Sequence, residues 1–336
     1  MRAPGFWHEK PGLISALLAP LGALYALGTR RRLAKGPRIR ADVPVICVGN
    51  INAGGTGKTP TAIALAQRLI ARGLKPHAVT RGYGGSLAGP VQVDPQTHSA
   101  VEVGDEALLL AAFLPVWVAA DRAKGANAAV AAEADVILLD DGFQNPALAY
   151  DLSLIVVDAW RGFGNGCVIP AGPLREPVRA GLSRADLLLS IGSQQAQTRF
   201  HESWGAAING MPHATGTLVP LPTGLPMQNL RVLAFAGIGH PEKFFQTLKG
   251  MGAEILATHA LADHQPLSDA LMHRLLREAR EKGAQVVTTE KDAVRLSASL
   301  RPQVMTIPVR LELDDWTPLD EALDRVLPQI SPAPSA

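Results

Sequence analysis

A stretch of twelve residues, GNINAGGTGKTP from Gly49 to Pro60, combines the residue types of a phosphate-binding loop. Glycines at positions 54, 55 and 57 would let backbone N–H groups turn toward a polyphosphate at a helix N-terminus. Lys58 would reach the β- and γ-phosphates of a nucleotide, and Thr59 would bind Mg²⁺. A Gly-rich turn that only starts a helix does not require this Lys-Thr ending, so the pattern favours a nucleotide site.

One position departs from the usual pattern G-x-x-x-x-G-K-[ST], because Asn52 stands where the first glycine is expected. Asparagine tolerates the left-handed backbone conformation nearly as well as glycine, so we expect Asn52 to hold the same turn. The residues predicted to bind ATP are Asn52, Ala53, Gly54, Gly55, Thr56, Gly57, Lys58 and Thr59.

A pair of acidic residues follows an apolar run in VILLDDGFQ, Val136 to Gln144. Apolar residues that lead to Asp140 and Asp141 match the Walker B pattern, which places a carboxylate beside Mg²⁺ and across from the phosphate loop. Taken alone, the pattern is equally typical of a strand that ends in an acidic turn. Paired with the phosphate loop in one sheet, it predicts a metal-binding carboxylate.

Two roles are open for Asp105, which lies in the motif GDE at Gly104 to Glu106 before a helix-like run. Aspartate commonly caps a helix N-terminus. A kinase also needs one carboxylate that orients or deprotonates the acceptor hydroxyl and another that holds metal. The residues alone do not decide between these roles.

Isolated charged residues give weaker signals. Arg122 in ADR and Arg175 in GPLREP suit phosphate at strand ends, but surface arginines generally have no specific partner. By default, His264 in DHQP is an ordinary loop residue before a helix. The motif TTEKDAVRL, Thr288 to Leu296, suggests no function by itself.

These motifs fall among apolar runs that alternate with helical patterns. The predicted strands are Val43–Val48, Pro76–Thr80, Pro115–Ala120, Asp135–Leu139, Leu152–Val157 and Asp186–Ser190. The predicted helices include Thr59–Arg72, Ala107–Leu114 and Ala123–Ala132. Such alternation predicts an α/β fold with a parallel sheet, like that of P-loop NTPases, and helices on both faces. Ligands then bind beyond the carboxyl ends of the strands.

The composition changes between Asn209 and Leu230, where prolines and threonines replace the alternating pattern and predict an interdomain connection. A smaller α/β unit is predicted from strands Arg231–Ala236, Ala253–Thr258 and Gln285–Thr289, helices Pro241–Met251 and Pro266–Lys282, and a final strand and helix to about Leu327. The predicted division is an N-terminal segment 1–40, a nucleotide-binding domain 41–208, a linker 209–230 and a C-terminal domain 231–330.

The N-terminal segment is basic and contains one apolar run. Residues 1–40 carry eight Lys or Arg and one acid, so their charge is +7 while the other 296 residues sum to −5. The run from Gly12 to Gly28 has only 17 residues. On a helix, one face would carry Leu13, Ile14, Leu17, Leu18, Leu21, Leu24 and Tyr25.

This predicted helix suits a membrane interface, because Phe6 and Trp7 precede it and Arg30, Arg31 and Arg32 follow it. A spanning helix needs about 20 predominantly apolar residues, so the run is marginal for that role. A secretory signal peptide would need a more basic start and a small-residue cleavage site. An ordinary core helix stays open as an alternative.

The overall composition is that of a globular protein. The chain has 336 residues, enough for two domains, with 47% hydrophobic and 18% charged residues. Its two cysteines, Cys47 and Cys167, make neither a disulfide framework nor a metal cluster, which favours a reducing compartment.

Several motifs occur together in an order that resembles the tetraacyldisaccharide 4'-kinases, the lipid A 4'-kinases of Gram-negative bacteria. The matching motifs are PVICVGNINAGGTGKTP, TRGYGG, VGDEALLL, DDGFQN, GPLREP, AFAGIGHPEKFF, ADHQPLSD and TTEKDAVRL. The resemblance implies transfer of the γ-phosphate of ATP, with Mg²⁺, to the 4'-hydroxyl of a tetraacylated glucosamine disaccharide 1-phosphate. It also implies lipid A (lipopolysaccharide) biosynthesis and a peripheral location at the cytoplasmic face of the bacterial inner membrane.

The resemblance also implies residue roles. Asp105 and His264 would form a catalytic dyad that acts with Lys58. Arg122 and Arg175 would contact phosphates of the donor or acceptor. The residues expected at the metal, including those predicted above, are Thr59, Glu106, Asp140, Asp141 and Gln144.

Three further points follow from the resemblance. The family's loop carries Asn where Walker A has Gly, so Asn52 is normal in it. Asn145 replaces a common His and Ala107 a common Pro, without removing any assigned role. Because Asp105 and His264 lie in different predicted domains, we expect the domains to close for turnover.

Other classes of function fit less well. A membrane-associated P-loop ATPase switch would carry a signature lysine where this chain has Ala53. A GTPase would carry Lys-x-Asp, whereas Lys291 and Asp292 are adjacent. Nucleic acid binding is not favoured, because no basic patch recurs downstream of the N-terminal segment. Nothing in the sequence demands more than a monomer, so we expect a monomeric lipid kinase.

Overall fold

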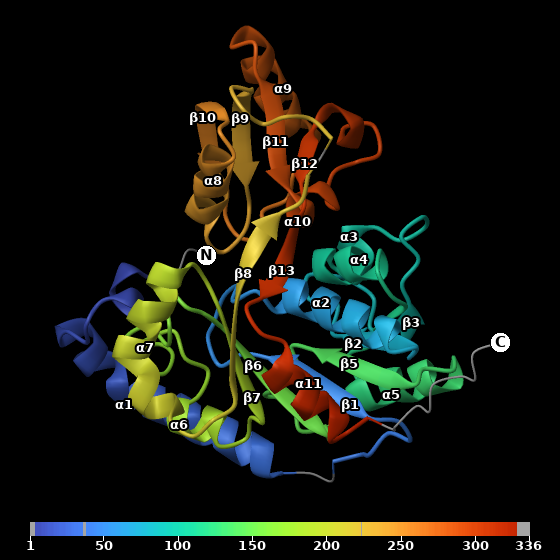
Figure 1. Cartoon of the computed structure of the whole chain (residues 1–336), viewed down its shortest axis with the longest axis vertical. Helices are drawn as coiled ribbons and strands as arrows, with labels where there is room; N and C mark the ends of the chain where they lie inside the picture. The colour runs from blue at the N-terminus through green and yellow to red at the C-terminus, as the bar shows by residue number, and fades with distance from the viewer. Residues whose placement is uncertain (1–3, 36–37, 223, 328–336) are drawn as a thin grey trace.

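The computed structural model describes residues 4–35, 38–222 and 224–327, which form two α/β bodies joined by two strands (Figure 1). Some sequence-based expectations lie outside the described residues. They are Arg2 of the basic segment, residue 223 of the expected linker and residues 328–330 of the expected C-terminal domain.

The larger body is built on a sheet of nine strands within the described ranges, in the order β13-β8-β7-β6-β1-β5-β2-β4-β3. Neighbouring strands are parallel except at the two edges, where β3 and β13 run antiparallel to their neighbours. This confirms the predicted parallel sheet. The strands are β1 Val45–Gly49, β2 Pro76–Thr80, β3 Val91–Gln92, β4 Val116–Val118, β5 Val136–Asp140, β6 Leu152–Asp158, β7 Leu187–Ile191, β8 His213–Pro220 and β13 Val309–Leu313.

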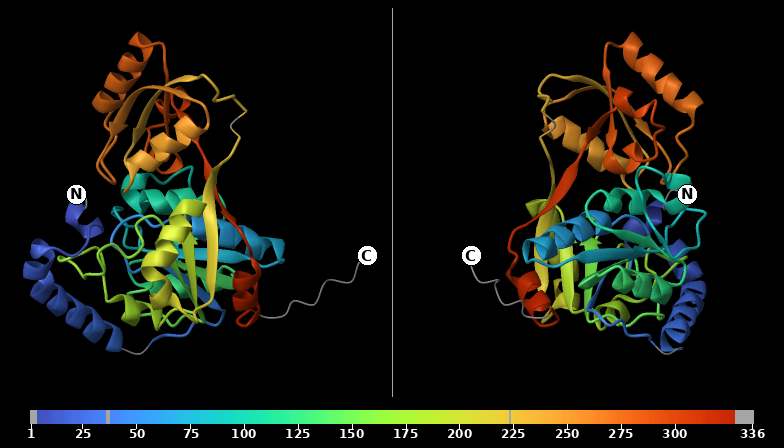
Figure 2. Two further views of the ribbon diagram at one scale, coloured as in Figure 1. Left: turned by 60° about the vertical axis from the view of Figure 1, so that its left-hand side comes forward. Right: turned by 90° about the vertical axis from the view of Figure 1, so that its right-hand side faces the viewer.

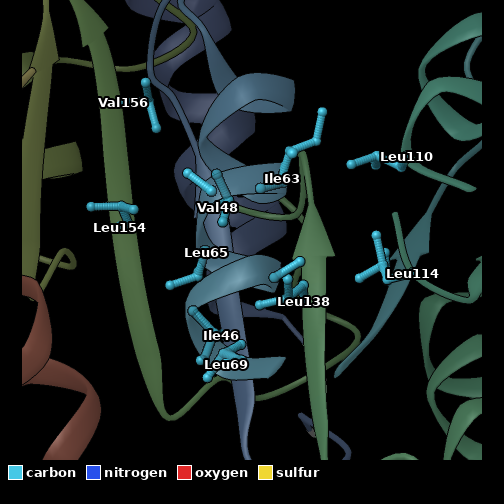
Figure 3. Close-up of a cluster of buried hydrophobic side chains, with 14 of the residues drawn as sticks. Ile46, Val48, Ile63, Leu65, Leu69, Leu110, Leu114, Leu138, Leu154 and Val156 are labelled. Atoms are coloured by element: carbon cyan, nitrogen blue, oxygen red, sulfur yellow. The ribbon is translucent and has the colours of Figure 1, made fainter. Parts of the chain in front are cut away.

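Helices cover both faces of this sheet, as predicted, because side chains alternate along each strand. Ile46 and Val48 of β1 pack with Ile63, Leu65 and Leu69 of α2 (Figure 3). On the opposite face, β1 packs into a second cluster with residues of α5, α6 and α7. The helices of this body are α2 Lys58–Ala71, α3 Ala100–Val103, α4 Asp105–Ala111, α5 Arg122–Ala131, α6 Val178–Leu182, α7 Gln194–Ile208 and α11 Thr317–Asp324.

The smaller body has a parallel sheet of four described strands, in the order β10-β9-β11-β12. Its apolar residues form one cluster on the α9 side and another on the α8 side. The elements are β9 Arg231–Ala236, α8 Pro241–Gly250, β10 Glu254–Ala260, α9 Asp269–Glu281, β11 Gln285–Thr289, α10 Glu290–Ala293 and β12 Met305–Ile307.

The division of the chain differs from the predicted one at two places. The expected linker contains β8, which pairs with β7 inside the large sheet. The expected last strand of the smaller unit is β13, which leaves that unit and pairs antiparallel with β8. Both views of Figure 2 show β8 and β13 running together between the bodies. The buried positions of β8, Ala214 and Gly216, are too small to give a strand pattern in the sequence.

The N-terminal helix α1, Leu13–Ala34, lies on the outside of the large body (Figure 2). It is longer than the predicted run, because nothing in Thr29 to Ala34 breaks a helix. Its large apolar side chains face outward, as Leu13 is 78% and Leu17 72% exposed. Its inner face consists of Ser15, Leu18, Gly22, Ala26, Thr29 and Leu33. Only Leu18 departs from the predicted apolar face.

Candidate active site

The predicted phosphate loop connects β1 to α2. Gly54 and Gly57 adopt positive φ angles of 114° and 98°, which glycine accepts without strain. A Cβ on Gly57 would lie 2.7 Å from Cδ1 of Ile191, so that position also requires the smallest residue. Asn50 supports the loop from inside, because its Nδ2 donates to Oγ1 of Thr56 at 3.1 Å. The loop conformation therefore depends on glycine backbone and one buried amide.

Asn52 does not hold the turn as predicted. It has no positive φ, unlike Gly54 and Gly57 of the same loop. Its buried side chain instead donates from Nδ2 to the carbonyl oxygen of Gly162 at 3.0 Å. Next to it, the N–H of Ala53 donates to the carbonyl oxygen of Pro173 at 2.7 Å. The prediction was wrong because it considered only the local backbone, whereas the partners of Asn52 come from a distant segment.

Asp140 and Asp141 stand side by side at the end of β5 but differ in their partners. Both carboxylate oxygens of Asp140 are buried without a hydrogen-bond partner among the described residues. Burial, and next the charge of Glu106, raises the pKa of Asp140 to about 7. Burial also opposes ionisation of Asp141, but Lys58 at 3.5 Å and Arg175 at 3.1 Å outweigh it and lower the pKa of Asp141.

The bare carboxylate of Asp140 fits a cation, because a nearby positive charge would stabilise a buried carboxylate that lacks a partner. In kinase sites Mg²⁺ is held by one or two carboxylates and by substrate phosphates rather than by an all-protein cage. Among the described residues, no group of three or more His, Cys, Asp or Glu side chains is placed to hold a metal.

The other predicted metal residues have protein partners or lie nearby on α2. Thr59 is the second residue of α2, directly after Lys58. The Oε1 atom of Glu106 is 3.0 Å from Nζ of Lys291. The Oε1 atom of Gln144 accepts from Arg175 at 3.2 Å. These contacts leave the second carboxylate oxygen of Glu106 and one lone pair of the Gln144 amide oxygen for other ligands.

Asp105 and His264 meet across the two bodies, although 159 positions separate them in the sequence. The Nδ1 atom of His264 lies 3.0 Å from Oδ2 of Asp105, which is 3% exposed. Gly104 occupies the N-cap position of α4, so Asp105 is not the helix cap. Burial disfavours the ionised form of Asp105, but His264 and the charge of Lys291 outweigh it and lower the pKa of Asp105. The carboxylate is therefore ionised and oriented toward His264.

The motif RGYGG packs against the start of α4. A Cβ on Gly104 would lie 2.6 Å from the carbonyl oxygen of Tyr83, so the close approach requires glycine. The ring of Tyr83 meets the ring of His264 edge-on, with 5.4 Å between centroids. Residues 81–88 and Ala120 line a hollow of about 370 Å³ beside this contact.

The motif TTEKDAVRL supplies site residues that sequence reasoning missed. Lys291 Nζ lies 3.0 Å from Glu106 and 3.4 Å from Nε2 of His264. The buried carboxylate of Asp292 accepts from the N–H of Gly237 and pairs with Arg295. The available signal was that charged residues follow the strand β11 directly, because strand ends carry site residues in such folds.

Two further contacts place the smaller body over the phosphate loop. A Cβ on Gly239 would lie 3.3 Å from the backbone nitrogen of Gly55. Lys243 of α8 forms an ion pair with Asp158 at the end of β6. The smaller body therefore contacts both the phosphate loop and the residues around Asp105.

Comparisons with known proteins agree with this arrangement. The family model of tetraacyldisaccharide-1-P 4'-kinase matches residues 14–328. The chain belongs to this family. Tetraacyldisaccharide 4'-kinase of Jannaschia sp. (strain CCS1) is 73% identical over 97% of this chain and 99% of its own length. The corresponding protein of Dinoroseobacter shibae is 64% identical over 98% of both chains.

A solved structure of the family has the same fold. The crystal structure of LpxK from Aquifex aeolicus in complex with ATP superposes with a TM-score of 0.75 at 26% identity, and covers 94% of this chain and 100% of that chain. The predicted family and fold class are thus confirmed.

Within this family member, the two predicted phosphate-binding arginines differ in position. Arg175 points to Asp141 and Gln144 beside the phosphate loop. Arg122, the first residue of α5, is 4% exposed and donates to the carbonyl oxygens of Ala119 and Ala120. Its Nε has no hydrogen-bond partner among the described residues. The structure brings Arg175, but not Arg122, into contact with the acidic end of β5.

Proposed function

We propose that this protein is an ATP-dependent kinase that phosphorylates the 4'-hydroxyl of a tetraacyldisaccharide 1-phosphate in lipid A biosynthesis. The observation that carries the proposal is the contact between Asp105 and His264 beside a phosphate loop. Glu106, adjacent to Asp105, lies close enough to Asp140 to raise its pKa. We therefore treat Asp105 and Glu106, the phosphate loop, and the end of β5 at Asp140 as one site.

In the proposed reaction, Asp105 accepts the proton of the 4'-hydroxyl, and His264 holds the carboxylate in place. The hydroxyl oxygen forms a bond to the γ-phosphorus, and the bond from that phosphorus to the β–γ bridging oxygen breaks, which releases ADP. Backbone N–H groups of the loop bind the phosphates. The side chains of Lys58 and Arg175 place positive charge beside the transferred γ-phosphoryl group, where they stabilise its negative charge.

Mg²⁺ fits beside Asp140 and Thr59, where it would supply positive charge to the phosphate oxygens. We assign the hollow lined by residues 81–88 to the sugar acceptor, because it lies next to the ring contact of Tyr83 with His264. Tyr83 is 67% exposed, so its ring is available to pack against a bound sugar.

The acyl chains of the acceptor point to the role of α1. This helix has 22 residues, and by length and composition an 18-residue stretch of it could cross a membrane, with only 17% of that stretch buried. Its outward residues include Leu17, Leu21 and Leu24, and Arg30 to Arg32 follow. We assign it to the cytoplasmic surface of the inner membrane as a peripheral anchor of a monomeric enzyme, where cationic and apolar side chains bind together.

The test of the function is phosphate transfer. ATP labelled at the γ-phosphate should label the acylated disaccharide in the presence of Mg²⁺, and labelled GTP serves as the comparison donor. Hydrolysis of ATP without labelling of the lipid would overturn the kinase and favour a membrane-associated ATPase switch. Replacement of Lys58 by Ala should abolish ATP binding, since this side chain ends the phosphate loop.

The test of the membrane role is vesicle flotation. The variant Leu17→Gln with Leu21→Gln changes exposed side chains and leaves the inner face of α1 intact. We expect this double variant to float less with anionic vesicles than the unchanged protein. The same substitution at exposed Leu225, in the connection from β8 to β9, is the matched control. Equal flotation of all three proteins would contradict the assignment.

A further inference from the structure

The inner face of α1 contacts a long connection, residues 162–174, which we call the bridging segment. Ser15 is 2% exposed, and its Oγ accepts from Nδ2 of Asn165 at 3.0 Å. Two turns later, a Cβ on Gly22 would lie 2.8 Å from the carbonyl oxygen of Val168. The helix therefore approaches the bridging segment through small residues, while its large apolar side chains point away from the protein.

Asn165 connects the N-terminal residues to the bridging segment. Its Nδ2 also donates to the carbonyl oxygen of Ala171 at 2.9 Å, and its Oδ1 accepts from the N–H of Cys167 at 3.0 Å. Trp7, before α1, accepts from the N–H of Asn165 at 2.9 Å and donates from Nε1 to the carbonyl oxygen of Pro170 at 3.1 Å. The first helical residues and the bridging segment thus share one hydrogen-bond network.

The opposite side of the bridging segment contacts the phosphate loop. Asn52 Nδ2 donates to Gly162 at its start, and the N–H of Ala53 donates to Pro173 near its end. Arg175, which reaches Asp141, follows directly and donates from its backbone N–H to Ile51 at 2.7 Å. Asn52 is 5% exposed and Gly162 is buried, so loss of the Asn52 side chain would leave the carbonyl oxygen of Gly162 without this hydrogen bond.

We propose that Asn52 is a positioning residue of the phosphate loop, held by α1 through the bridging segment. The helix α1 thereby fixes the position of the phosphate loop, in addition to its proposed role as a membrane anchor. In the usual motif a glycine leaves this position to the local backbone, whereas here a side chain fixes it to a second segment. The inference rests on the proposed function in one respect, namely that the loop binds the phosphates of ATP.

The first experiment distinguishes two roles of Asn52. The residue either only fills a turn, or its side chain tethers the loop to the bridging segment. Asn52→Gly restores the usual motif, so it would be neutral if Asn52 only filled a glycine-like turn. If the side chain is the tether, Asn52→Gly and Asn52→Ala should both raise the KM for ATP about tenfold, as expected for one buried hydrogen bond. The KM for the acylated disaccharide should stay unchanged, and the selective rise of the KM for ATP is informative because a smaller folded fraction would lower the apparent kcat and change neither KM.

The second experiment uses two glycines of α1 in the full-length protein. Gly22→Ala forces the helix away from Val168, whereas Gly28→Ala meets no atom within 4 Å and is the matched control. We expect Gly22→Ala to raise the KM for ATP several-fold with unchanged vesicle flotation, because the outer face is intact. Gly28→Ala should change neither quantity. Combined with Asn52→Ala, Gly22→Ala should add little, because both act through one set of contacts.

Three outcomes overturn the inference: an unchanged KM for ATP in Asn52→Gly, an equal effect of Gly22→Ala and Gly28→Ala, or fully multiplicative effects in the double variant. Thermal melting of each variant shows that the protein remains folded during the assay. The proposed function has a separate test in Lys58→Ala. If that variant loses ATP binding while Asn52→Gly keeps it, only the inference fails. If both bind ATP normally, the assigned loop itself is wrong.

Discussion

The predicted phosphate loop and the proposed catalytic pair, Asp105 and His264, are built in different ways. The loop lies within one connection, from β1 to α2, and its conformation depends on neighbours inside the larger body. Asp105 belongs to the same body, but His264 comes from the smaller one, and their contact exists only when the two bodies touch. Because of this difference, we expect substitutions at the catalytic pair to change kcat without changing the KM for ATP, and substitutions at the loop to change the KM for ATP. The following predictions use that separation.

The largest effect is expected at the catalytic pair. Asp105→Ala or His264→Ala should lower kcat by roughly 10²- to 10⁴-fold, the usual contribution of a positioned acid or base. The KM for ATP should change little, because among the described residues neither side chain forms a hydrogen bond or ion pair with the loop. Steady-state transfer assays give both constants. His259→Ala, which removes a histidine of the smaller body paired with Glu278, is the control and should keep normal kcat. Unchanged kcat in both Asp105 and His264 variants would exclude the dyad.

A smaller effect is expected at Lys291, which holds Glu106 at 3.0 Å across the two bodies. Lys291→Met should lower kcat about tenfold with a normal KM for ATP, since a charge-assisted contact across the bodies is lost. Lys291→Arg should recover part of the rate. The exposed Lys282, changed to Met, is the control in the same body. If Lys291→Met weakened ATP binding as much as it lowered kcat, nucleotide binding and phosphate transfer would not be separable.

The smallest effect is expected in the stability of the nucleotide half. Asp140 has a pKa raised to about 7 by burial, against an ordinary value of 3.8. Between these values the folded protein binds a proton that the unfolded chain lacks, so the free energy of unfolding falls as the pH rises. In EDTA, Asp140→Asn should therefore melt a few degrees higher than the unchanged protein at about pH 8, with the difference shrinking toward about pH 4. A difference independent of pH would contradict the burial of an unpaired carboxylate.

Local motifs made much of the site predictable. The residue types of the loop from Gly54 to Thr59 and of the strand end at Asp140 follow from what phosphates and Mg²⁺ require over short spacings. The order of strands and helices could be read for the same reason, since apolar periodicity is a local property. His264 was recognised only through its family resemblance, because a single loop histidine carries no pattern.

Other features were beyond the sequence because their partners are distant. The strand β8 was taken for a linker, since its buried positions are Ala214 and Gly216 rather than large apolar residues. Lys291 was considered in the sequence only as part of a GTPase motif, which it did not match, whereas the structure places it, just after β11, beside Glu106. The helix α1 showed its apolar face in the sequence, but which face would contact the protein was not determined by periodicity.

The sequence by itself determined the parallel sheet and the family, and it predicted the phosphate loop and the acidic strand end, because each depends on residue types at fixed short spacings. The resemblance implied that Asp105 and His264 act together, but only the tertiary structure decided that their side chains touch. It alone also decided that Lys291 binds Glu106 and that Asn52 acts through its side chain. The physical reason is the same in all three cases. Hydrogen bonds and ion pairs act over about 3 Å in space, and only packing of the chain brings such distant residues that close.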